Sequence, residues 1–510
     1  MSPTEQKLLA ENAQLREQVA ELAQRLRWFE KQIFGQKSEK QPFNIPGQDS
    51  LFSLVPEMPE SPELPKQKPT VPRGTAKKMR PDDCVSDSGL RFGPQVPVIT
   101  IPVIAPELQG EHADNYSIID TKITYKLAQR PESYVVLRYE TPVVKCKTTA
   151  KINSPAMPAG IFEGSIADVS LVVGMMTEKF LYHMPLYRQH QKIQQDGITL
   201  SRASLIKWVQ SGIELLRPIV NALLANVIAS QTLILDETPI KVGRDKSDIA
   251  KKGKMHQGQI WPIYGDQDEI VFTYASRRAT EHLKTQLKDF KGTILSDGYS
   301  AYTCYAQKTE GIVHAQCWVH VRRKFIEAAN TAPDLAAHVV ALIGELYRLE
   351  AEIRNNGLID EEKRLYRQKH CAPVVDAIFA WGRNAIMHPN LTPKHAMSKA
   401  LNYMLTREAN LRVFLNDPAV APDTNQIERQ IRPIALGRKN WLFCWTEIGA
   451  EHVAIIQSLI CTCKLHGIDP KVYLLDVLQR VSIHPASRVE ELTPRRWKTL
   501  FADQPLGVIF

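Results

Sequence analysis

Two short apolar segments that each end in an aspartate constrain this chain of 510 residues more than any other feature of its sequence. The runs LIL and TIL directly precede Asp236 and Asp297, and runs of this kind predict short buried β-strands. Burial alone would penalise a charged residue at the end of such a strand. Two acids at neighbouring strand ends can share a divalent metal ion, because hard cations prefer carboxylate oxygens. Surface acids at strand ends are also common, so the two aspartates alone leave both interpretations open.

A third carboxylate, Glu428, lies in a segment with helical periodicity. Isoleucines recur there at i, i+4 and i+7, which predicts a stripe that faces the core: Ile427, Ile431 and Ile434. Glu428 lies about 100° round the helix from the first of them. Asn425 and Arg432 share its face. Asp423, with Gln426 three residues later, resembles a capping box at the start of this helix.

The order of the predicted elements around these acids is more specific than the acids themselves. QTLILDETPIKV is expected to be a strand, QIWPIYGDQDEIVFTYA a hairpin that turns at Gly265-Asp266, and GTILSDGYSAY a second acid-ended strand. A carboxylate-bearing helix after such a set matches an RNase H-like core. The chemistry suits two-metal phosphoryl transfer, in which one ion activates water or a 3′-hydroxyl and the other stabilises the leaving oxygen. Two Mg²⁺ or Mn²⁺ ions are the expected cofactors.

Other parts of the chain differ in amino-acid composition and in the periodicity of their hydrophobic residues, which predicts separate segments. Residues 1–38 contain heptads over 7–34, and the Asn at one a position favours a two-stranded parallel coiled coil, although an amphipathic helix packed on its own chain fits the pattern too. Residues 39–82 are rich in proline, which predicts an extended linker. Residues 83–150 predict a small β module. Residues 160–228 predict helices that resemble a helix-turn-helix, with Gly197 in a turn and Ser201 as an N-cap; an ordinary helical connector fits as well.

Composition narrows the possible partners and compartment. The net charge of +9 and a pI near 9.0 favour polyanionic partners, nucleic acid first. The polar start argues against a secretory signal, and no apolar run approaches the roughly 18 residues of a membrane span. The eight cysteines are scattered singly, apart from Cys461 and Cys463, which suits a reducing compartment. We therefore expect a cytoplasmic protein that contacts the nucleoid if it binds DNA.

Several long segments resemble the bacterial transposases of the insertion sequence 66 family: LDETPIKV, LSDGYSAY, HAQCWVHVRRKF and NQIERQIRPIALGRKNWLF. The likeness extends over nearly the whole chain. It implies an RNase H-like DDE core at 229–330 and 418–450, a helical insertion at 331–417, and a C-terminal helical segment at 451–510. The 131 residues from Asp297 to Glu428 are too many for one connection in a compact core, which agrees with an insertion. By similarity, Asp236, Asp297 and Glu428 are the catalytic acids that bind metal.

The cysteines depart from the pattern of these relatives. The relatives usually carry two C-x-x-C pairs that bind zinc ahead of the helical region, whereas here that region has only Cys84 and Cys146. Two isolated cysteines cannot make a four-ligand site, so zinc is not expected. Cys317 and His320 resemble a C-x-x-H signature of several transposase families. We predict that they have a structural or DNA-positioning role, and that Cys461 and Cys463 are packed in the core.

The resemblance implies a transposase that binds the terminal repeats of its element, cleaves DNA there and transfers the strand. The predicted DNA contacts are basic or polar: Arg202, Lys207, Arg322, Arg323, Asn425, Arg429, Arg432, Arg438 and Lys439. Expected partners are a second copy, through residues 7–34, and small accessory proteins of the same element. The main alternative is a catalytically silent dimeric DNA-binding regulator. An RNase H-like nuclease shares the chemistry, and no glycine-rich phosphate loop supports another kind of phosphotransferase.

Overall fold

A computed structural model describes residues 90–507 except 110–112, 131–132, 156–160, 163, 244–254, 278–279, 289 and 390. The predicted coiled coil, the linker and Cys84 lie outside the described residues. Within them the fold is mixed α/β, as the sequence predicts. The residues from 79 onward form one compact unit.

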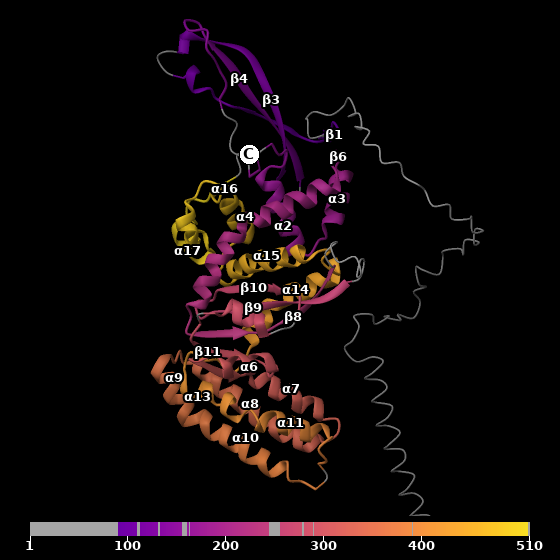
Figure 1. Cartoon of the computed structure of the whole chain (residues 1–510), viewed down its shortest axis with the longest axis vertical. Helices are drawn as coiled ribbons and strands as arrows, with labels where there is room; N and C mark the ends of the chain where they lie inside the picture. Colours follow the sequence, from indigo (N-terminus) through magenta and orange to yellow (C-terminus); the bar gives the residue numbers. More distant parts are fainter. Residues whose placement is uncertain are drawn as a thin grey trace, which may run out of the picture. The chain divides into compact units, whose positions relative to one another are not determined.

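The central sheet has six strands: β7 Thr232–Leu235, β8 Thr238–Gly243, β9 Met255–Tyr264, β10 Ile270–Ala275, β11 Gly292–Ser296 and β12 Ile312–Gln316. Their order is β10-β9-β7-β11-β12, and β8 pairs with β9 (Figure 1). β9 runs antiparallel to its neighbours, whereas β7, β11 and β12 run parallel to one another. β7 ends directly before Asp236, as the sequence predicts, and the rest of QTLILDETPIKV continues after Glu237 as a separate strand, β8.

Helices cover both sides of this sheet. α4 (Arg202–Ile228) and α15 (Glu447–Leu465) lie on one side, and α6 (Ser300–Lys308) and α7 (Trp318–Ala328) on the other (Figure 1). α5 (Thr280–Gln286) follows β10.

α15 also covers the outer edge of the sheet. The N–H of Phe272 donates to Ser458 Oγ (2.8 Å), and the N–H of Ile270 donates to Thr462 Oγ1 (3.2 Å). These hydroxyls satisfy backbone groups of β10 that would otherwise offer a pairing edge.

Among the described residues, two helices are long and apolar enough to cross a membrane by length and composition, although the sequence predicts no such span. The relevant 18-residue windows of α4 and α15 have mean hydropathies of 1.3 and 1.2. The window in α15 is 72% buried and the one in α4 is 39% buried. Because α15 packs along β10, its apolar character is explained by its place in the core.

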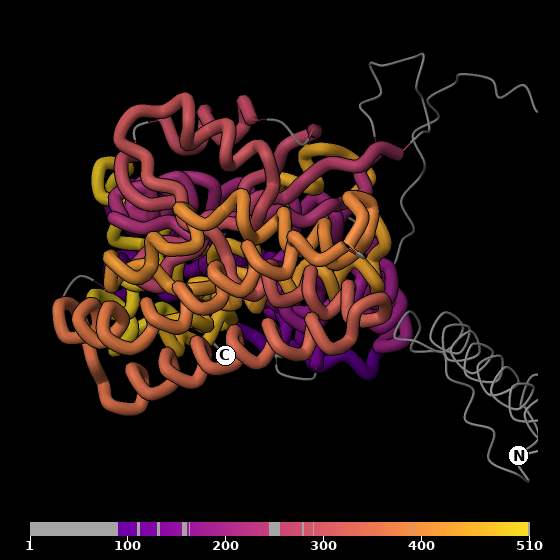
Figure 2. Tube along the Cα trace, turned by 90° about the horizontal axis from the view of Figure 1, so that it is seen from below, coloured from indigo at the N-terminus to yellow at the C-terminus, as the bar shows by residue number. Residues whose placement is uncertain are grey.

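The segment between β12 and the helix of Glu428 is helical, as expected for the insertion. It contains α8 (Pro333–Asn355), α9 (Asp360–Tyr366), a π-helical turn (Arg367–Cys371), α10 (Ala372–Ala385), α11 (Ala396–Leu405), α12 (Glu408–Leu411) and α13 (Val413–Asn416). In Figure 2 its longer helices run side by side. α14 (Asn425–Trp441) then returns to the sheet, where it contacts β8 and β9.

The β module and the helical region precede the central sheet. β2 (Val98–Pro102), β3 (Tyr116–Arg130), β4 (Ser133–Cys146) and β5 (Ile152–Asn153) form one small sheet, and β1 (Arg91–Phe92) pairs with β6 (Ile198–Thr199). Short 3₁₀ turns lie at Pro106–Leu108 and Ala113–Asn115. α2 (Val169–Phe180) and α3 (Leu186–Gln195) follow. Gly197 has φ +82° in the turn, and Ser201 Oγ accepts from the N–H of Ser204 (3.1 Å), so both predictions about this turn are confirmed.

α4 continues through Pro218 to Ile228, where the predicted helical region also ends. In the C-terminal segment, α16 (Pro470–Arg480) is followed by a 3₁₀ segment (Ala486–Leu492) and α17 (Pro494–Leu500). Trp497 of α17 is buried, and its Nε1–H donates to the buried Asp476 (2.6 Å), which fixes the tail to α16.

Candidate active site

The two aspartates leave neighbouring parallel strands at the same edge of the central sheet. All four residues of β7 are buried. Leu295 of β11 pairs with Ile234 of β7, so Asp297 and Asp236 each follow two residues beyond a paired position. Each carboxylate accepts an N–H from the next turn: Asp236 from Glu237 and Asp297 from Tyr299, both at 2.8 Å. These bonds hold each carboxylate against its own loop.

Glu428 approaches this edge from the first turn of α14. Its Oε1 lies 3.9 Å from Nε2 of His320, and its Oε2 lies 3.7 Å from Nη2 of Arg323. Burial lowers the pKa of His320, while the negative charges of Asp297 and Glu428 oppose that shift. The negative charges of two of the three predicted acids, Asp297 and Glu428, therefore both act on His320. The Glu428 side chain is 30% exposed and accessible to a substrate.

A buried cysteine connects the start of α7 to the start of α14. The backbone N–H and the hydroxyl of Thr424 both lie 3.3 Å from the sulfur of Cys317. The N–H of Trp318 donates to the carbonyl of Pro422 (2.9 Å). Burial raises the pKa of Cys317 to about 11, so the thiol is protonated at neutral pH. These contacts fix where α14 begins, and Glu428 is one turn further along.

The start of α14 differs from the predicted capping box. The N-cap is Thr424, and Asp423 instead accepts the N–H of Asn425 (2.9 Å). The prediction is wrong because the buried Thr424 hydroxyl is directed to Cys317, with Glu428 Oε1 at 3.5 Å. This tertiary contact displaces the local capping pattern.

Helices of the insertion contact the loop after Asp297. A Cβ on Gly298 would lie 2.3 Å from the hydroxyl of Tyr403 in α11, so any larger residue would force the Tyr403 side chain to shift. Arg407 lies over the Tyr403 ring at 4.0 Å and donates to the carbonyl of Gly298 (3.4 Å). No local sequence pattern predicts that Gly298 contacts Tyr403 and Arg407, because these residues are more than 100 positions away in the chain.

A tyrosine also supports the turn after Asp236. The hydroxyl of Tyr302 in α6 donates to Glu237 Oε2 at 2.5 Å. Tyr302 is fully buried and packs edge-on against Trp261 of β9, with ring centroids 5.9 Å apart. The contact between Tyr302 and Glu237 was not predicted from the sequence, although both residues belong to segments that carry the family resemblance.

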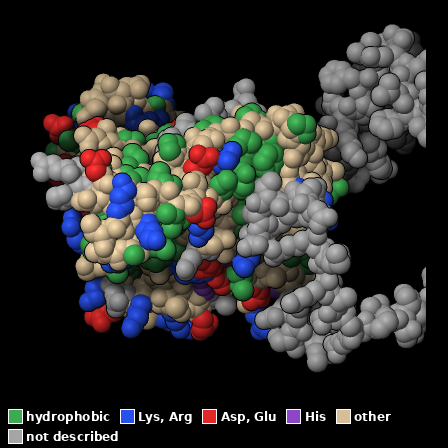
Figure 3. Space-filling view, turned by 90° about the horizontal axis from the view of Figure 1, so that it is seen from above, with side chains coloured by type: hydrophobic (Ala, Val, Ile, Leu, Met, Phe, Trp, Pro, Cys, Tyr) green, Lys and Arg blue, Asp and Glu red, His purple; other side chains and the backbone are tan. Residues whose placement is uncertain are grey.

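The predicted DNA contacts fall in more than one place. Arg322 and Arg323 are exposed on α7, and Asn425, Arg429 and Arg432 lie on α14 around Glu428. Arg438 is half-buried: it donates to the carbonyl of Pro239, and burial lowers its pKa. Lys439 is exposed at the end of α14, whereas Arg202 and Lys207 lie on α4, outside this site. On the face seen in Figure 3, Lys and Arg side chains are dispersed among hydrophobic ones.

The three acids suit a divalent cation by their chemistry, since carboxylate oxygens are the preferred ligands of Mg²⁺. Among the residues that the structure describes, no three His, Cys, Asp or Glu side chains are close enough to form a metal site. Cys461 and Cys463 are buried within α15, which confirms their predicted packing in the core.

Two family profiles that match this chain describe the same family of proteins. The profile described as "Transposase IS66 family" matches residues 164–452, and that of the "IS66 C-terminal element" matches residues 458–495. The uncharacterized protein y4hP of Sinorhizobium fredii is 30% identical over 74% of this chain and 70% of its own length. The uncharacterized protein y4jD of the same organism is 32% identical over 69% of this chain and 70% of its own length.

Proposed function

The chain belongs to the IS66 transposase family, and we propose that it is a DDE-type enzyme that cleaves the ends of its element and joins them to target DNA. The observation that carries this proposal is that Asp236 and Asp297 both follow the carboxyl ends of adjacent parallel strands, at the same edge of the sheet. The contacts at Cys317 direct Glu428 toward the same edge. The strand order, antiparallel on one side of β7 and parallel on the other, supports an RNase H-like core.

We propose that Asp236, Asp297 and Glu428 hold two Mg²⁺ or Mn²⁺ ions. When bound, such ions activate the attacking oxygen and stabilise the leaving oxygen of an in-line displacement. The protein itself contributes position and charge. Arg323 holds Glu428 in place, and the exposed Arg429 and Arg432 flank it, where they are suited to the phosphates of a bound strand.

The proposed partners follow from the family and the sequence. Membership in a transposase family implies that the protein acts on DNA, and we propose that it does so in the cytoplasm, at the nucleoid. Dimerisation through residues 7–34 and association with small accessory proteins of the element are also proposals.

The test is metal-dependent cleavage and joining of labelled duplexes that carry the terminal repeats flanking this reading frame. We expect Asp236→Asn, Asp297→Asn and Glu428→Gln each to reduce cleavage to background while DNA binding persists, because each change removes one metal-binding charge and no predicted phosphate contact. Glu327→Gln is the matched control, since Glu327 is an exposed acid of α7 paired with Lys324.

Retained cleavage by any of the three variants would remove that residue from the catalytic set. If the wild-type protein binds the repeats without cutting them, even with the accessory proteins supplied, the silent DNA-binding alternative is correct.

A further inference from the structure

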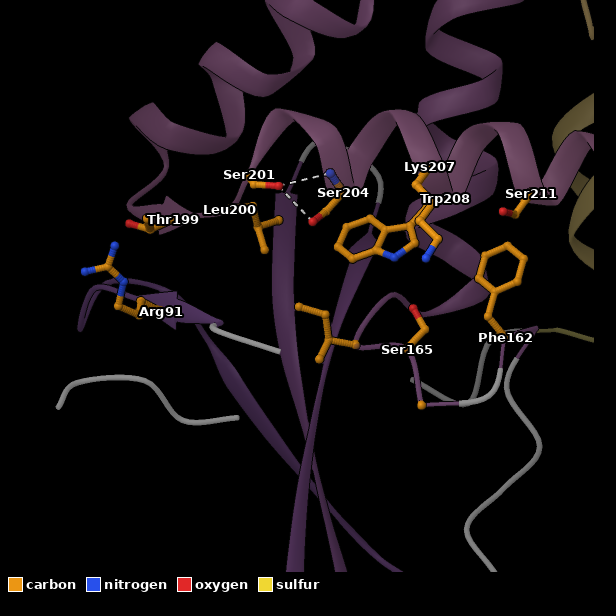
Figure 4. A pocket seen from close by; sticks show the side chains of 12 residues that line it. Arg91, Phe162, Ser165, Thr199, Leu200, Ser201, Ser204, Lys207, Trp208 and Ser211 are labelled. Atoms are coloured by element: carbon orange, nitrogen blue, oxygen red, sulfur yellow. Dashed lines mark hydrogen bonds between the residues drawn. The ribbon is translucent and has the colours of Figure 1, made fainter. Parts of the chain in front are cut away.

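A cavity of about 660 Å³ lies between the first turns of α4 and a wall formed by Phe162 and residues 164–166 (Figure 4). Its volume is typical of small-ligand pockets, which span roughly 300–1,000 Å³. Its walls include Phe162, Leu200 and Trp208, together with several hydroxyl groups. None of the described residues that line it is acidic.

Hydrogen-bond donors from two separate segments point into this cavity. Lys207 and Trp208 project from α4, with the ammonium group and the indole nitrogen directed to the same space, and Ser165 faces them from the opposite wall (Figure 4). Ser165 Oγ accepts the N–H of Ala167 (3.1 Å), which leaves its proton available for donation. Lys207 forms no salt bridge with any residue that the structure describes. Converging donors, with no acidic side chain among the described residues of the lining, favour an anion.

The aromatic side chains that line the cavity indicate which class of anion it would bind. The cavity is much larger than one phosphate requires, and the faces of Trp208 and Phe162 border the remaining space. Aromatic faces beside a cation are the combination that nucleic-acid-binding proteins use for unpaired nucleotides, because bases stack on the rings while the cation meets the backbone.

We propose that this cavity holds one nucleotide of the DNA substrate. Its phosphate would accept from Lys207, Trp208 and Ser165, and its sugar or base would lie against Trp208 and Phe162. This inference rests on the proposed function. Arg202 and Lys207 are both exposed near the start of α4; Lys207 also lines the cavity, whereas Arg202 lies over the Tyr187 ring at 5.3 Å.

The experiment measures affinity for a labelled terminal-repeat duplex over a series of salt concentrations. The variants are Lys207→Gln and Trp208→Phe, which removes the indole N–H and keeps an aromatic ring. The control is Lys308→Gln, an exposed lysine at the end of α6 and outside the cavity. We expect Lys207→Gln to weaken binding severalfold and to reduce the slope of log affinity against log salt by about 0.9, the value for one lost phosphate contact. Trp208→Phe should weaken binding less, and Lys308→Gln should match the wild type.

Duplexes with single methylphosphonate linkages then locate the contact. Neutralising the contacted phosphate should weaken binding to the wild type and have no further effect on Lys207→Gln. This coupling separates direct contact from a general loss of folding, which thermal melting of each variant also reports. Absence of a coupled position would overturn the proposal.

Three other outcomes have distinct meanings. If the wild type binds and cleaves the repeats while Lys207→Gln binds with unchanged affinity and slope, the cavity proposal fails and the proposed function stands. If dAMP binds in a Lys207-dependent manner without any change in DNA binding, the cavity takes a free nucleotide and the proposal is wrong. If the wild type does not bind the repeats at all, both proposals fail together.

Discussion

Cys317 illustrates how a single buried side chain can position a proposed catalytic group, Glu428, that it does not touch. Its protonated sulfur meets the N–H and hydroxyl of Thr424, and Glu428 follows one turn later. A buried donor that loses its partner costs about 1–3 kcal/mol. The position of Glu428 therefore depends on a residue 111 positions earlier in the chain.

We predict that Cys317→Ala lowers the free energy of unfolding by about 1–3 kcal/mol, because the Thr424 N–H is left buried without an acceptor. Cleavage should fall while DNA affinity is retained, and Cys317→Ser should recover part of the cleavage rate. Urea denaturation and the cleavage assay measure these effects, with Cys304→Ala in α6 as the control. Wild-type cleavage by Cys317→Ala would show that the sulfur does not position Glu428.

Glu214 shows the effect of a charge network between α4 and α15. Arg217 donates to both of its oxygens at 2.8 Å, and His452 Nε2 lies 2.6 Å from Oε1. The hydrogen bonds from Arg217 are the main reason why the pKa of Glu214 falls to about 2. The carboxylate is 43% exposed, so solvent screening keeps its contribution to stability modest.

The lowered pKa of Glu214 determines how the free energy of unfolding changes with pH. Because the folded pKa lies below the ordinary value of 4.5, the stabilisation is present above about pH 4.5 and is lost as the pH falls toward 2. The difference in free energy of unfolding between the wild type and Glu214→Gln should therefore shrink between pH 6 and pH 3. Urea denaturation across that range provides the measurement, and a constant difference would contradict the prediction.

At the scale of elements, the insertion is held by a buried ion pair. Arg367 forms two hydrogen bonds with Glu350 of α8, at 2.7 and 2.9 Å. Its Nη1 also donates to the carbonyls of Phe414, Asp417 and Val420. Those carbonyls belong to the end of α13 and the segment before α14. Arg367 therefore connects the insertion to the chain that leads into the helix of Glu428.

We predict that Arg367→Met destabilises the protein by about 3–5 kcal/mol, since Glu350 would remain buried without a counter-charge. Arg364→Met is a matched control one turn earlier, because Arg364 forms an exposed pair with Glu361. The control should change stability by no more than about 0.5 kcal/mol. Equal effects of the two substitutions on the denaturation midpoint would show that the buried pair contributes no more than the exposed one.

At the scale of the whole molecule, the proposed catalytic edge is assembled from segments far apart in the chain. β7 and β11 supply the aspartates, α14 supplies Glu428, and α11 of the insertion supports the loop after Asp297 through Tyr403 and Arg407. The proposed function also requires that two DNA ends be brought together. The heptads over residues 7–34 are the part of the sequence suited to pairing two copies.

We predict that the full-length protein is a dimer and that deletion of residues 1–38 yields a monomer, because the heptad seam would lose its partner. Light scattering coupled to size-exclusion chromatography measures both masses. A monomeric full-length protein would contradict this prediction, as would a shortened protein that remains dimeric.

The sequence alone determined those features that depend on neighbouring residues. Apolar runs predicted β7 and β11, the hydroxyl of Ser201 predicted a cap, and the 131-residue gap predicted the insertion. The family resemblance indicated the three acids. These inferences succeed because strand burial, helix capping and loop length are local or additive properties of the chain.

Only the tertiary structure decided how distant residues meet. The bond from Thr424 to Cys317 replaced the expected capping box, Tyr403 packed closely against Gly298, and α15 hydroxyls closed the edge of β10. The exposed Lys207 also became part of the lining of a cavity. Each of these contacts depends on backbone positions set by packing between elements, and buried polar groups take whichever partner that packing brings within hydrogen-bond distance.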